Sequence, residues 1–353
     1  MVGDHLNAIN DTVNIKQLEE TLFAFRTLAI EVRGEVIEEV RNLSSILGED
    51  VEGPAIVLVD FGAVKDRLKV QVGFPVGSPD VGVDVGVKKL EPVQVLTVDH
   101  EGPYDNIRDT YLRLYAVMRE RGLLPAPTAM EVLHRIDDER PEDSLFEIQW
   151  PLHDWTGLLA DGIEDVLGPE ARDHVMEGAD ALTPETPRDE RLEWVRAALL
   201  RLDGIANEEQ RYWAVSVCAD CYPTWRIEEL RQVYLDTGSV DEVMEAMKGD
   251  AEWYSTPYRE GNLIYHTKVP YDREAWESAT DPAKKRRAYC HCALVQDRID
   301  EVPPTYCYCG TGWVRQVWEG VLERPIRVEV LKSLPAGDDE CQFLIHLQED
   351  VVG

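Results

Sequence analysis

The sequence predicts an α+β protein with two folded domains. Three observations predict this class. A pattern of strand, helix, strand and strand occurs twice before residue 155, a Thr/Pro-rich stretch interrupts a helical and acidic region at 183–188, and helices then alternate with short hairpins. At 353 residues the chain is long enough for two or three hydrophobic cores. The expected divisions are a tail at 1–14, a first domain at 15–155, an acidic helical linker at 156–204 and a second α+β domain at 205–353.

The first repeat begins with a strand at 27–32 (TLAIEV) and continues with a helix from Gly34 to Gly48. Apolar residues recur at helical spacing along that helix, namely Val36, Val40, Leu43 and Leu47. Strands at 54–61 and 68–76 follow, and the last of them ends on an aromatic-Pro-aliphatic step.

The second repeat has the same order, with a strand at 93–98 and a helix that Gly102-Pro103 opens and Gly122 closes. Two strands follow, at 128–136 and 144–152, and the second again ends on an aromatic-Pro-aliphatic step. Two such repeats packed side by side form an antiparallel sheet with both helices against one face. The cleft between them is a natural ligand pocket.

The charge balance limits the classes of partner. The net charge is -32, from 68 acidic and 36 basic residues, and such a field repels phosphate backbones. We therefore expect no nucleic acid binding by this chain alone, and read most of the acidity as a solvated surface. The N-terminus has neither the basic nor the apolar region of a secretory signal, and no run of 18 apolar residues predicts a membrane span. A cytoplasmic location with free thiols is the expectation for the seven cysteines.

Two segments of the first domain carry a family resemblance. The motif HEGPYDNI at 100–107, the segment 130–152 and the twofold repeat resemble the GyrI-like effector-binding domains. These are the drug-sensing halves of several bacterial multidrug regulators and also occur as stand-alone proteins. The resemblance implies a pocket for bulky, flat and often cationic compounds. Because no helix-turn-helix segment is visible before residue 15, we expect a stand-alone binding protein rather than a DNA-reading regulator.

The same resemblance implies the ligand-binding residues. Family glutamates on the last two strands map to Glu131 and Glu147, and a carboxylate among apolar strand residues gains from an arriving cation. Strand alternation leaves open whether Glu147 faces the pocket or the solvent. The aromatic residues expected to line the pocket, or else to belong to the core, are Tyr104, Tyr111, Tyr115, Trp150 and Trp155. Some stand-alone members hydrolyse strained natural products, so a detoxifying hydrolase is the alternative function.

The second domain is expected to contain helices at 189–203, 207–219 and 310–324, with hairpins around 260–262 and 337–339. Its ending, from YCYCGTGW onwards, resembles an uncharacterised bacterial family with cysteine pairs and the small-molecule-binding domains related to bacteriochlorophyll vinyl reductases. That resemblance implies a fold and a second ligand pocket, and it names no reaction. The oligomeric state is left open.

Six cysteines fall into three close pairs. Such spacing is common among ligands of zinc or an iron–sulfur cluster, so a metal site is one interpretation. Reactive or redox thiols and plain packing are the others, because Cys-x-Cys in an extended segment also places two small side chains on one side. The pairs are Cys218 and Cys221, Cys290 and Cys292, and Cys307 and Cys309.

Overall fold

The structure is a computed structural model that describes residues 13–62, 65, 67–81 and 85–347. Its contacts divide the chain into two compact units, Met1–His153 and Asp154–Gly353. Each unit combines helices with an antiparallel sheet, so the predicted α+β class is confirmed.

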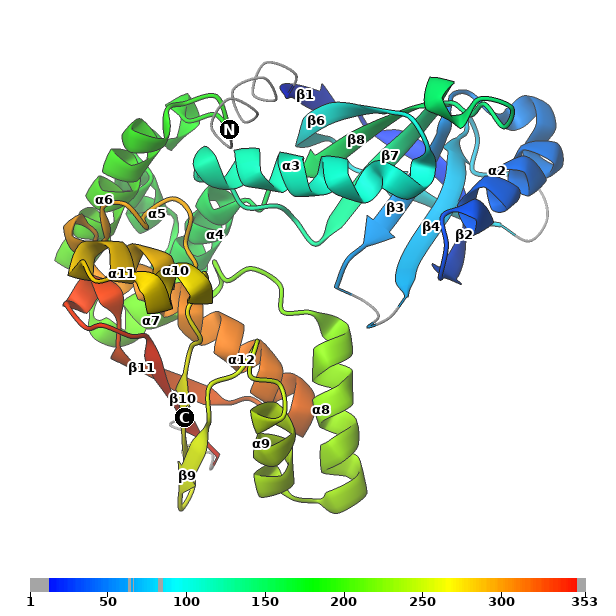
Figure 1. Ribbon diagram of the computed structural model, residues 1–353. Helices are drawn as coiled ribbons and strands as arrows, with labels where there is room; N and C mark the ends of the chain where they lie inside the picture. Colours follow the sequence, from blue (N-terminus) through cyan, green and yellow to red (C-terminus); the bar gives the residue numbers. More distant parts are fainter. Residues whose placement is uncertain (1–12, 63–64, 66, 82–84, 348–353) are drawn as a thin grey trace. The chain divides into compact units, whose positions relative to one another are not determined.

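The first unit contains both predicted repeats (Figure 1). In the first repeat β2 (Thr21–Ile30) starts earlier than expected because its first residues pair with an unpredicted strand. In the second, a 3-10 turn at Tyr104–Asn106 precedes the helix, which begins at Ile107. The remaining elements are β1 Asn14–Leu18, α2 Gly34–Leu47, β3 Ala55–Asp60, β4 Leu68–Pro75, β5 Gly86–Leu90, β6 Val93–Glu101, α3 Ile107–Glu120, β7 Thr128–Arg135 and β8 Leu145–Pro151.

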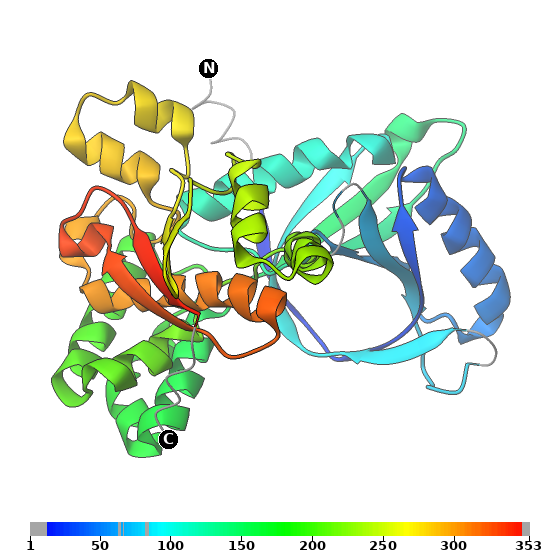
Figure 2. The ribbon, with the colours of Figure 1, turned by 90° about the horizontal axis from the view of Figure 1, so that it is seen from below.

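The described strands of this unit form one eight-stranded antiparallel sheet in the order β1-β6-β8-β7-β3-β4-β2-β5. The outermost strands, β1 and β5, are exchanged between the repeats: β1 precedes β2 yet pairs with β6, and β5 precedes β6 yet pairs with β2. Only Glu19 and Glu20 separate β1 from β2. Since two residues span at most about 7 Å, the two edges of the sheet curl towards each other, as Figure 2 shows.

The two faces of the curled sheet carry different cores. One face, here called the helix face, bears Val57, Glu131 and Ile148, which lie opposite one another on β3, β7 and β8. The apolar sides of α2 and α3 pack on this face, and Leu43, Leu114 and Met118 are fully buried there. The other face, here called the inner face, carries a smaller cluster around Phe23, Leu58, Val95 and Met130.

The second unit begins with helices that share a core with the cysteine segments. The region expected to be a linker packs through Leu159, Ile163 and Leu199 into a cluster that also contains Tyr289 and Cys290. It is therefore part of the second unit. The helices are α4 Trp155–Leu167, α5 Pro169–Val175, α6 Arg188–Ile205, α7 Glu208–Ser216, α8 Thr224–Thr237, α9 Val240–Lys248, α10 Arg273–Ser278, α11 Pro282–Tyr289 and α12 Tyr308–Leu322.

A four-stranded antiparallel sheet completes the second unit in the order β11-β12-β10-β9. Both predicted hairpins, β9 with β10 and β11 with β12, are present, and the pairing of β10 with β12 joins them into one sheet. Trp318 of α12 is fully buried against this sheet and α8. The strands are β9 Tyr258–Glu260, β10 Leu263–Thr267, β11 Arg327–Lys332 and β12 Gln342–His346.

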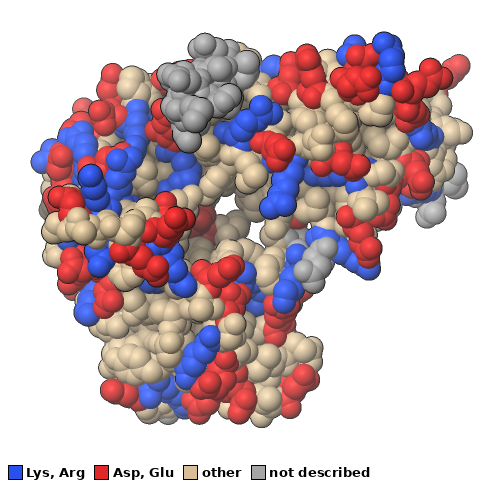
Figure 3. All heavy atoms as spheres, in the orientation of Figure 1, with Lys and Arg blue, Asp and Glu red and all other residues tan. Residues whose placement is uncertain are grey.

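Charged side chains of both signs lie on the surface that Figure 3 draws. Figure 3 shows Asp and Glu interspersed with Lys and Arg on the face that it presents. Within the described part of the chain, no helix is both long and apolar enough to cross a membrane.

Candidate functional site

A buried carboxylate lies on the helix face of the first unit. The side chain of Glu131, on β7, has no exposed surface. Arg33 donates to its Oε2 at 2.9 Å, and the Tyr111 hydroxyl donates to its Oε1 at 3.0 Å. The Tyr104 hydroxyl also donates to Oε2. Three donors from three separate segments thus converge on one carboxylate.

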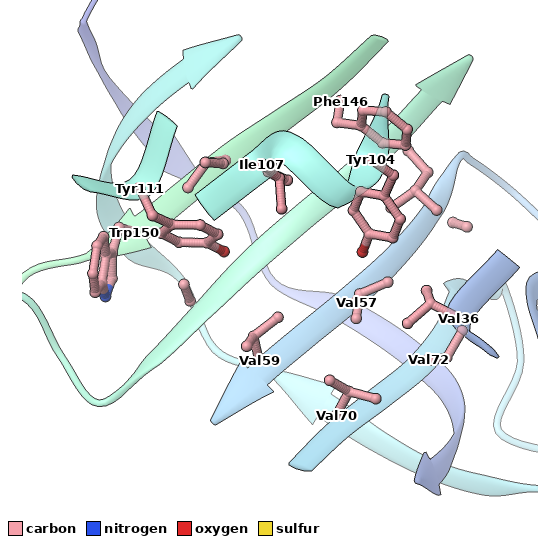
Figure 4. Close-up of a cluster of buried hydrophobic side chains, with 14 of the residues drawn as sticks. Val36, Val57, Val59, Val70, Val72, Tyr104, Ile107, Tyr111, Phe146 and Trp150 are labelled. Carbon is pink, nitrogen blue, oxygen red and sulfur yellow. The ribbon is translucent and has the colours of Figure 1, made fainter. Parts of the chain in front are cut away.

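Local sequence explains how these donors reach the carboxylate. Arg33 lies between the end of β2 and the start of α2, and its guanidinium also lies 5.1 Å from the ring centroid of Tyr104. Gly102 has a positive φ of 116°, and the turn that follows it places Tyr104 against Phe146. Tyr111 lies on the buried stripe of α3. Figure 4 shows both tyrosines projecting towards the side of the sheet on which β3 carries Val57 and Val59.

Electrostatics hold this cluster in one charge state. Burial lowers the pKa of Arg33, but Glu131 together with Tyr104 and Tyr111 outweighs this effect, and the net pKa is raised. Burial raises the pKa of Tyr104 and Tyr111 well above its usual value, and the adjacent carboxylate raises it further. Both hydroxyls therefore stay protonated and can donate, and the cluster is a neutral ion pair with two phenol donors.

Aromatic rings extend the cluster along the helix face. The Trp150 ring meets the Tyr111 ring edge-on, with 5.2 Å between their centroids. The Phe61 ring contacts both, with its centroid 5.1 Å from that of Tyr111 and 5.4 Å from that of Trp150. The indole N–H of Trp150 donates to the carbonyl of Ala126 at 2.9 Å, so its polar atom is satisfied while its ring packs among these aromatic neighbours. Phe61 is 38% exposed, so this aromatic group reaches the surface.

A groove of about 570 Å³ opens on the same face. It lies between α2 and the adjoining ends of β3 and β7, and its floor includes Ala55 and Leu133. These two residues are register partners and lie two positions from Val57 and Glu131. The groove thus lies next to the Glu131 cluster along the same strands.

Glu147 lies on the opposite face of the sheet. It pairs with Val132 and Asp99 across β7 and β6, so its side chain points to the inner face while Glu131 points to the helix face. It is only 4% exposed, and it accepts hydrogen bonds from Lys16 and Thr97. Nε2 of His134 lies 3.1 Å from its Oε2. Glu147 therefore neither shares a pocket with Glu131 nor faces the solvent.

Glu147 should make the stability of the fold depend on pH. Burial raises its pKa, but the hydrogen bonds from Lys16, Thr97 and His134 outweigh this and lower the pKa to about 2. Because this lies below the unfolded value, the carboxylate stabilises the fold above about pH 4.5, and that stabilisation is lost as the pH falls towards 2. Lys16 and His134 are partly exposed, so we expect roughly 2 kcal/mol at pH 7.

Urea unfolding from pH 7 to pH 2, followed by tryptophan fluorescence, measures this contribution. Glu147→Gln should be less stable than the wild type at pH 7, and the difference should vanish near pH 2. Glu142→Gln, at an exposed glutamate of the same unit, is the matched control. Parallel pH profiles for the wild type and Glu147→Gln contradict the prediction.

Of the seven residues predicted to bind a ligand, five meet on the helix face: Glu131, Tyr104, Tyr111, Tyr115 and Trp150. Glu147 lies on the inner face, and Trp155 belongs to the second unit, where it stacks on Tyr306. The sequence analysis missed Arg33, whose position next to Gly34 carries no signal of a partner on β7. Phe61 was missed too, although it follows a strand whose buried side chains share that face.

The cysteines of the second unit are all free thiols. Cys218, at the end of α7, is buried, and burial raises the pKa of its thiol. Cys221 is exposed. The Cys290 and Cys309 thiols hydrogen-bond to Cys292, which lowers the pKa of Cys292 and raises those of its two partners. Burial and the nearby Cys341 raise the pKa of Cys307.

The two Cys-x-Cys pairs thus lie together, and Cys218 is near enough to contribute to the raised pKa of Cys309. Among the described residues, no group of three or more His, Cys, Asp or Glu side chains is arranged to hold a metal ion. The zinc or iron–sulfur site inferred from the spacing stays a prediction.

The comparisons with known proteins come from sequence and from structure. Residues 283–352 match a family of unknown function, DUF6144, and a comparison with curated proteins finds no match. The EcmrR C-terminal domain is 16% identical, with 40% of this chain and 96% of that chain covered and a TM-score of 0.36. SAV2435 bound to tetraphenylphosphonium is 11% identical, with 40% and 93% covered and a TM-score of 0.32.

A hydrolase from Listeria innocua is 14% identical, with 40% of this chain and 91% of that chain covered and a TM-score of 0.29. The family match lies in the second unit, and the resemblance of that unit to vinyl-reductase-related domains stays a prediction. In the first unit, the duplicated sheet with both helices on one face is the arrangement that the resemblance to GyrI-like domains implies.

Proposed function

We propose that the first unit binds a hydrophobic, cationic small molecule at Glu131 on the helix face. The observation that carries the proposal is a fully buried carboxylate that already holds a guanidinium against an aromatic ring. Burying a carboxylate is costly unless a positive charge and hydrogen bonds compensate it. Arg33 supplies that charge from within the chain, and an aromatic cation has the chemistry to replace it.

Arg33 is placed so that it can yield to such a ligand. It makes no side-chain cap to α2, and its side chain keeps 12% of its surface exposed while that of Glu131 keeps none. Rotation of the Arg33 side chain towards solvent leaves the phenol donors on the carboxylate. The vacated space is bounded by Tyr104, a ring that favours a cation on its face. Tyr111 and Trp150 then offer apolar contact for the body of the ligand.

Titration calorimetry with tetraphenylphosphonium, a lipophilic aromatic cation without hydrogen-bond donors, tests the proposal. We expect saturable binding to the wild type and at least about tenfold weaker binding to Glu131→Gln, because the variant removes the negative charge that meets the cation. Arg33→Met should bind more tightly than the wild type, since no internal cation has to be displaced.

Two further variants check the position of the site. Glu147→Gln should keep wild-type affinity because its side chain lies on the other face, and Glu142→Gln serves as the exposed control. Equal affinity of the wild type and Glu131→Gln, or binding lost only in Glu147→Gln, overturns the proposal. The alternative function is a detoxifying hydrolase. In that case mass spectrometry of the compound recovered after incubation would show the mass of one added water molecule.

A further inference from the structure

The second unit contains a cavity of about 460 Å³. Three segments surround it: the start of α7, the 3-10 turn Pro304–Cys307 with the first residue of α12, and the edge strand β11 (Figure 1). All of the residues around it lie between Asp203 and Ala336, so the cavity belongs wholly to this unit. Pockets for small molecules range from about 300 to 1,000 Å³, so this volume suits a small molecule.

Charged side chains of both signs line the cavity. They are Arg211, Arg327 and Lys332, and Asp203, Glu208 and Glu329. Because the whole chain has 36 basic and 68 acidic residues, these equal numbers make the wall less acidic than the chain at large. Glu208, Glu329 and Lys332 are exposed and form the rim, whereas the other three are partly buried. Such a wall complements a ligand that carries both charges.

Tyr212 forms the floor of the cavity, and its hydroxyl group lacks a partner. Nothing among the described residues hydrogen-bonds to this hydroxyl, although the side chain is only 1% exposed. The Arg327 guanidinium lies 3.7 Å from the ring centroid, and the Trp213 and Tyr308 rings meet it edge-on at 4.9 and 5.9 Å between centroids. Buried polar groups are nearly always hydrogen-bonded, so a ligand with an oxygen atom would supply what this hydroxyl lacks.

Arg211, the neighbour of Tyr212 on α7, keeps one edge of its guanidinium for a ligand. Its Nη1 donates to Oδ1 of Asp203 at 3.2 Å, and the same oxygen accepts from the Thr305 hydroxyl at 2.6 Å. The buried Nε has no acceptor within the described part of the chain, and Nη2 donates to no described residue. An edge of this kind binds a carboxylate through two parallel hydrogen bonds.

The rim offers a place for a positive charge. Glu208 is the first residue of α7, is exposed and forms no ion pair with a described residue. Glu329 on β11 adds a second exposed carboxylate. Val330, Leu331 and the ring of Tyr308 supply apolar contact between rim and floor. The cavity thus combines a carboxylate site, an ammonium site and an apolar wall.

We propose that this cavity binds a zwitterionic amino acid or short peptide with an apolar side chain. The ligand carboxylate accepts two hydrogen bonds from Arg211 and one from the Tyr212 hydroxyl. Its ammonium group lies between Glu208 and Glu329, and its side chain packs on Leu331. A free amino acid and a peptide share this chemistry and differ in the distance between their charges.

Titration calorimetry of the full-length chain with L-phenylalanine and with the dipeptide alanyl-phenylalanine tests the proposal. At least one of these probes should bind saturably, and the tighter of the two identifies the length of the ligand. Phenylalanine amide lacks the carboxylate, and N-acetylphenylalanine lacks the ammonium group. Each should therefore bind at least about tenfold more weakly than the preferred probe.

Two variants locate the site. Arg211→Gln should weaken binding at least about tenfold. Its matched control is Arg231→Gln, at an ion-paired arginine of α8 whose side chain is also 27% exposed, and this variant should bind as the wild type does. Tyr212→Phe removes a hydroxyl that has no partner in the described structure, so it should weaken binding roughly threefold or more without lowering thermal stability.

The separation of affinity from stability in Tyr212→Phe is a result that a purely structural role would not give. Circular dichroism checks that each variant is folded. The proposal is overturned if neither probe binds, or if the amide or the N-acetyl compound binds as tightly as the preferred probe. It is also overturned if Arg211→Gln and Tyr212→Phe both keep wild-type affinity. A loss of thermal stability in Tyr212→Phe contradicts it too, because the hydroxyl would then have a partner within the chain.

Discussion

Arg33→Met is expected to lower the free energy of unfolding by about 3–5 kcal/mol at neutral pH, because it leaves Glu131 charged and buried without its partner. The two tyrosine hydroxyls still donate, but a hydrogen bond compensates less than a guanidinium at 2.9 Å. The measurement is chemical unfolding in urea, monitored by tryptophan fluorescence. Glu131→Gln in the Arg33→Met background should recover most of the lost stability, since it removes the unpaired charge.

Arg41→Met is the matched control for this cycle. Arg41 lies about two turns further along α2 than Arg33, and it pairs with Asp138 where both side chains are more than half exposed. Such a pair contributes between about 0 and 1 kcal/mol. If Arg33→Met costs no more than Arg41→Met, the Glu131 cluster does not depend on its internal cation, and the displacement of Arg33 by a ligand loses its basis.

Gly312→Ala is the second substitution with a large expected effect. A Cβ at Gly312, in α12, would lie 1.9 Å from the backbone carbonyl oxygen of Ser216 at the end of α7. A backbone atom between two packed helices cannot rotate away, so the helices must separate. We expect a loss of roughly 3 kcal/mol or more, at the upper end of the range for overpacking. Thermal unfolding followed by circular dichroism measures it.

Gly204→Ala separates this clash from the general effect of replacing a helical glycine. Gly204 lies in α6, and no atom lies within 4 Å of the Cβ that the substitution would add. Alanine favours helix over glycine by up to about 1 kcal/mol in a helix interior, so this variant should be equal to the wild type or more stable. If Gly312→Ala costs no more stability than Gly204→Ala, the clash with Ser216 has no measurable effect and the prediction is wrong.

Much of the first unit could be predicted from local pattern. The apolar stripes of α2 and α3 predict helices because burial of one side of a helix selects residues at a fixed spacing. The edge strands β1 (NIKQL) and β5 (GVKKL) were missed because backbone pairing holds them, and most of their side chains remain exposed or partly exposed. Polar and charged residues are typical of such edges, and they leave no alternation to recognise.

Only part of the site could be predicted, again because some of its residues leave no local pattern in the sequence. Tyr104, Tyr111 and Glu131 were placed in one pocket because the resemblance to GyrI-like domains implies it, and the apolar stripe of α3 also indicates burial of Tyr111. Local alternation also separated Glu147 from Phe146 and Ile148, but it could not reveal that a curled sheet buries both of its faces. Arg33 depends on a contact across 98 positions, which one sequence does not encode in any local pattern.

The exchange of β1 and β5 makes the two repeats inseparable as folding units. A chain divided between β4 and β5 leaves the first repeat without β5, the outer partner of β2, and leaves the second without β1, the outer partner of β6. Such pairings join residues far apart in the chain, so they close late and slow the search for the native state. The two repeats share one order of elements, yet their sheet has to assemble as a single cooperative unit.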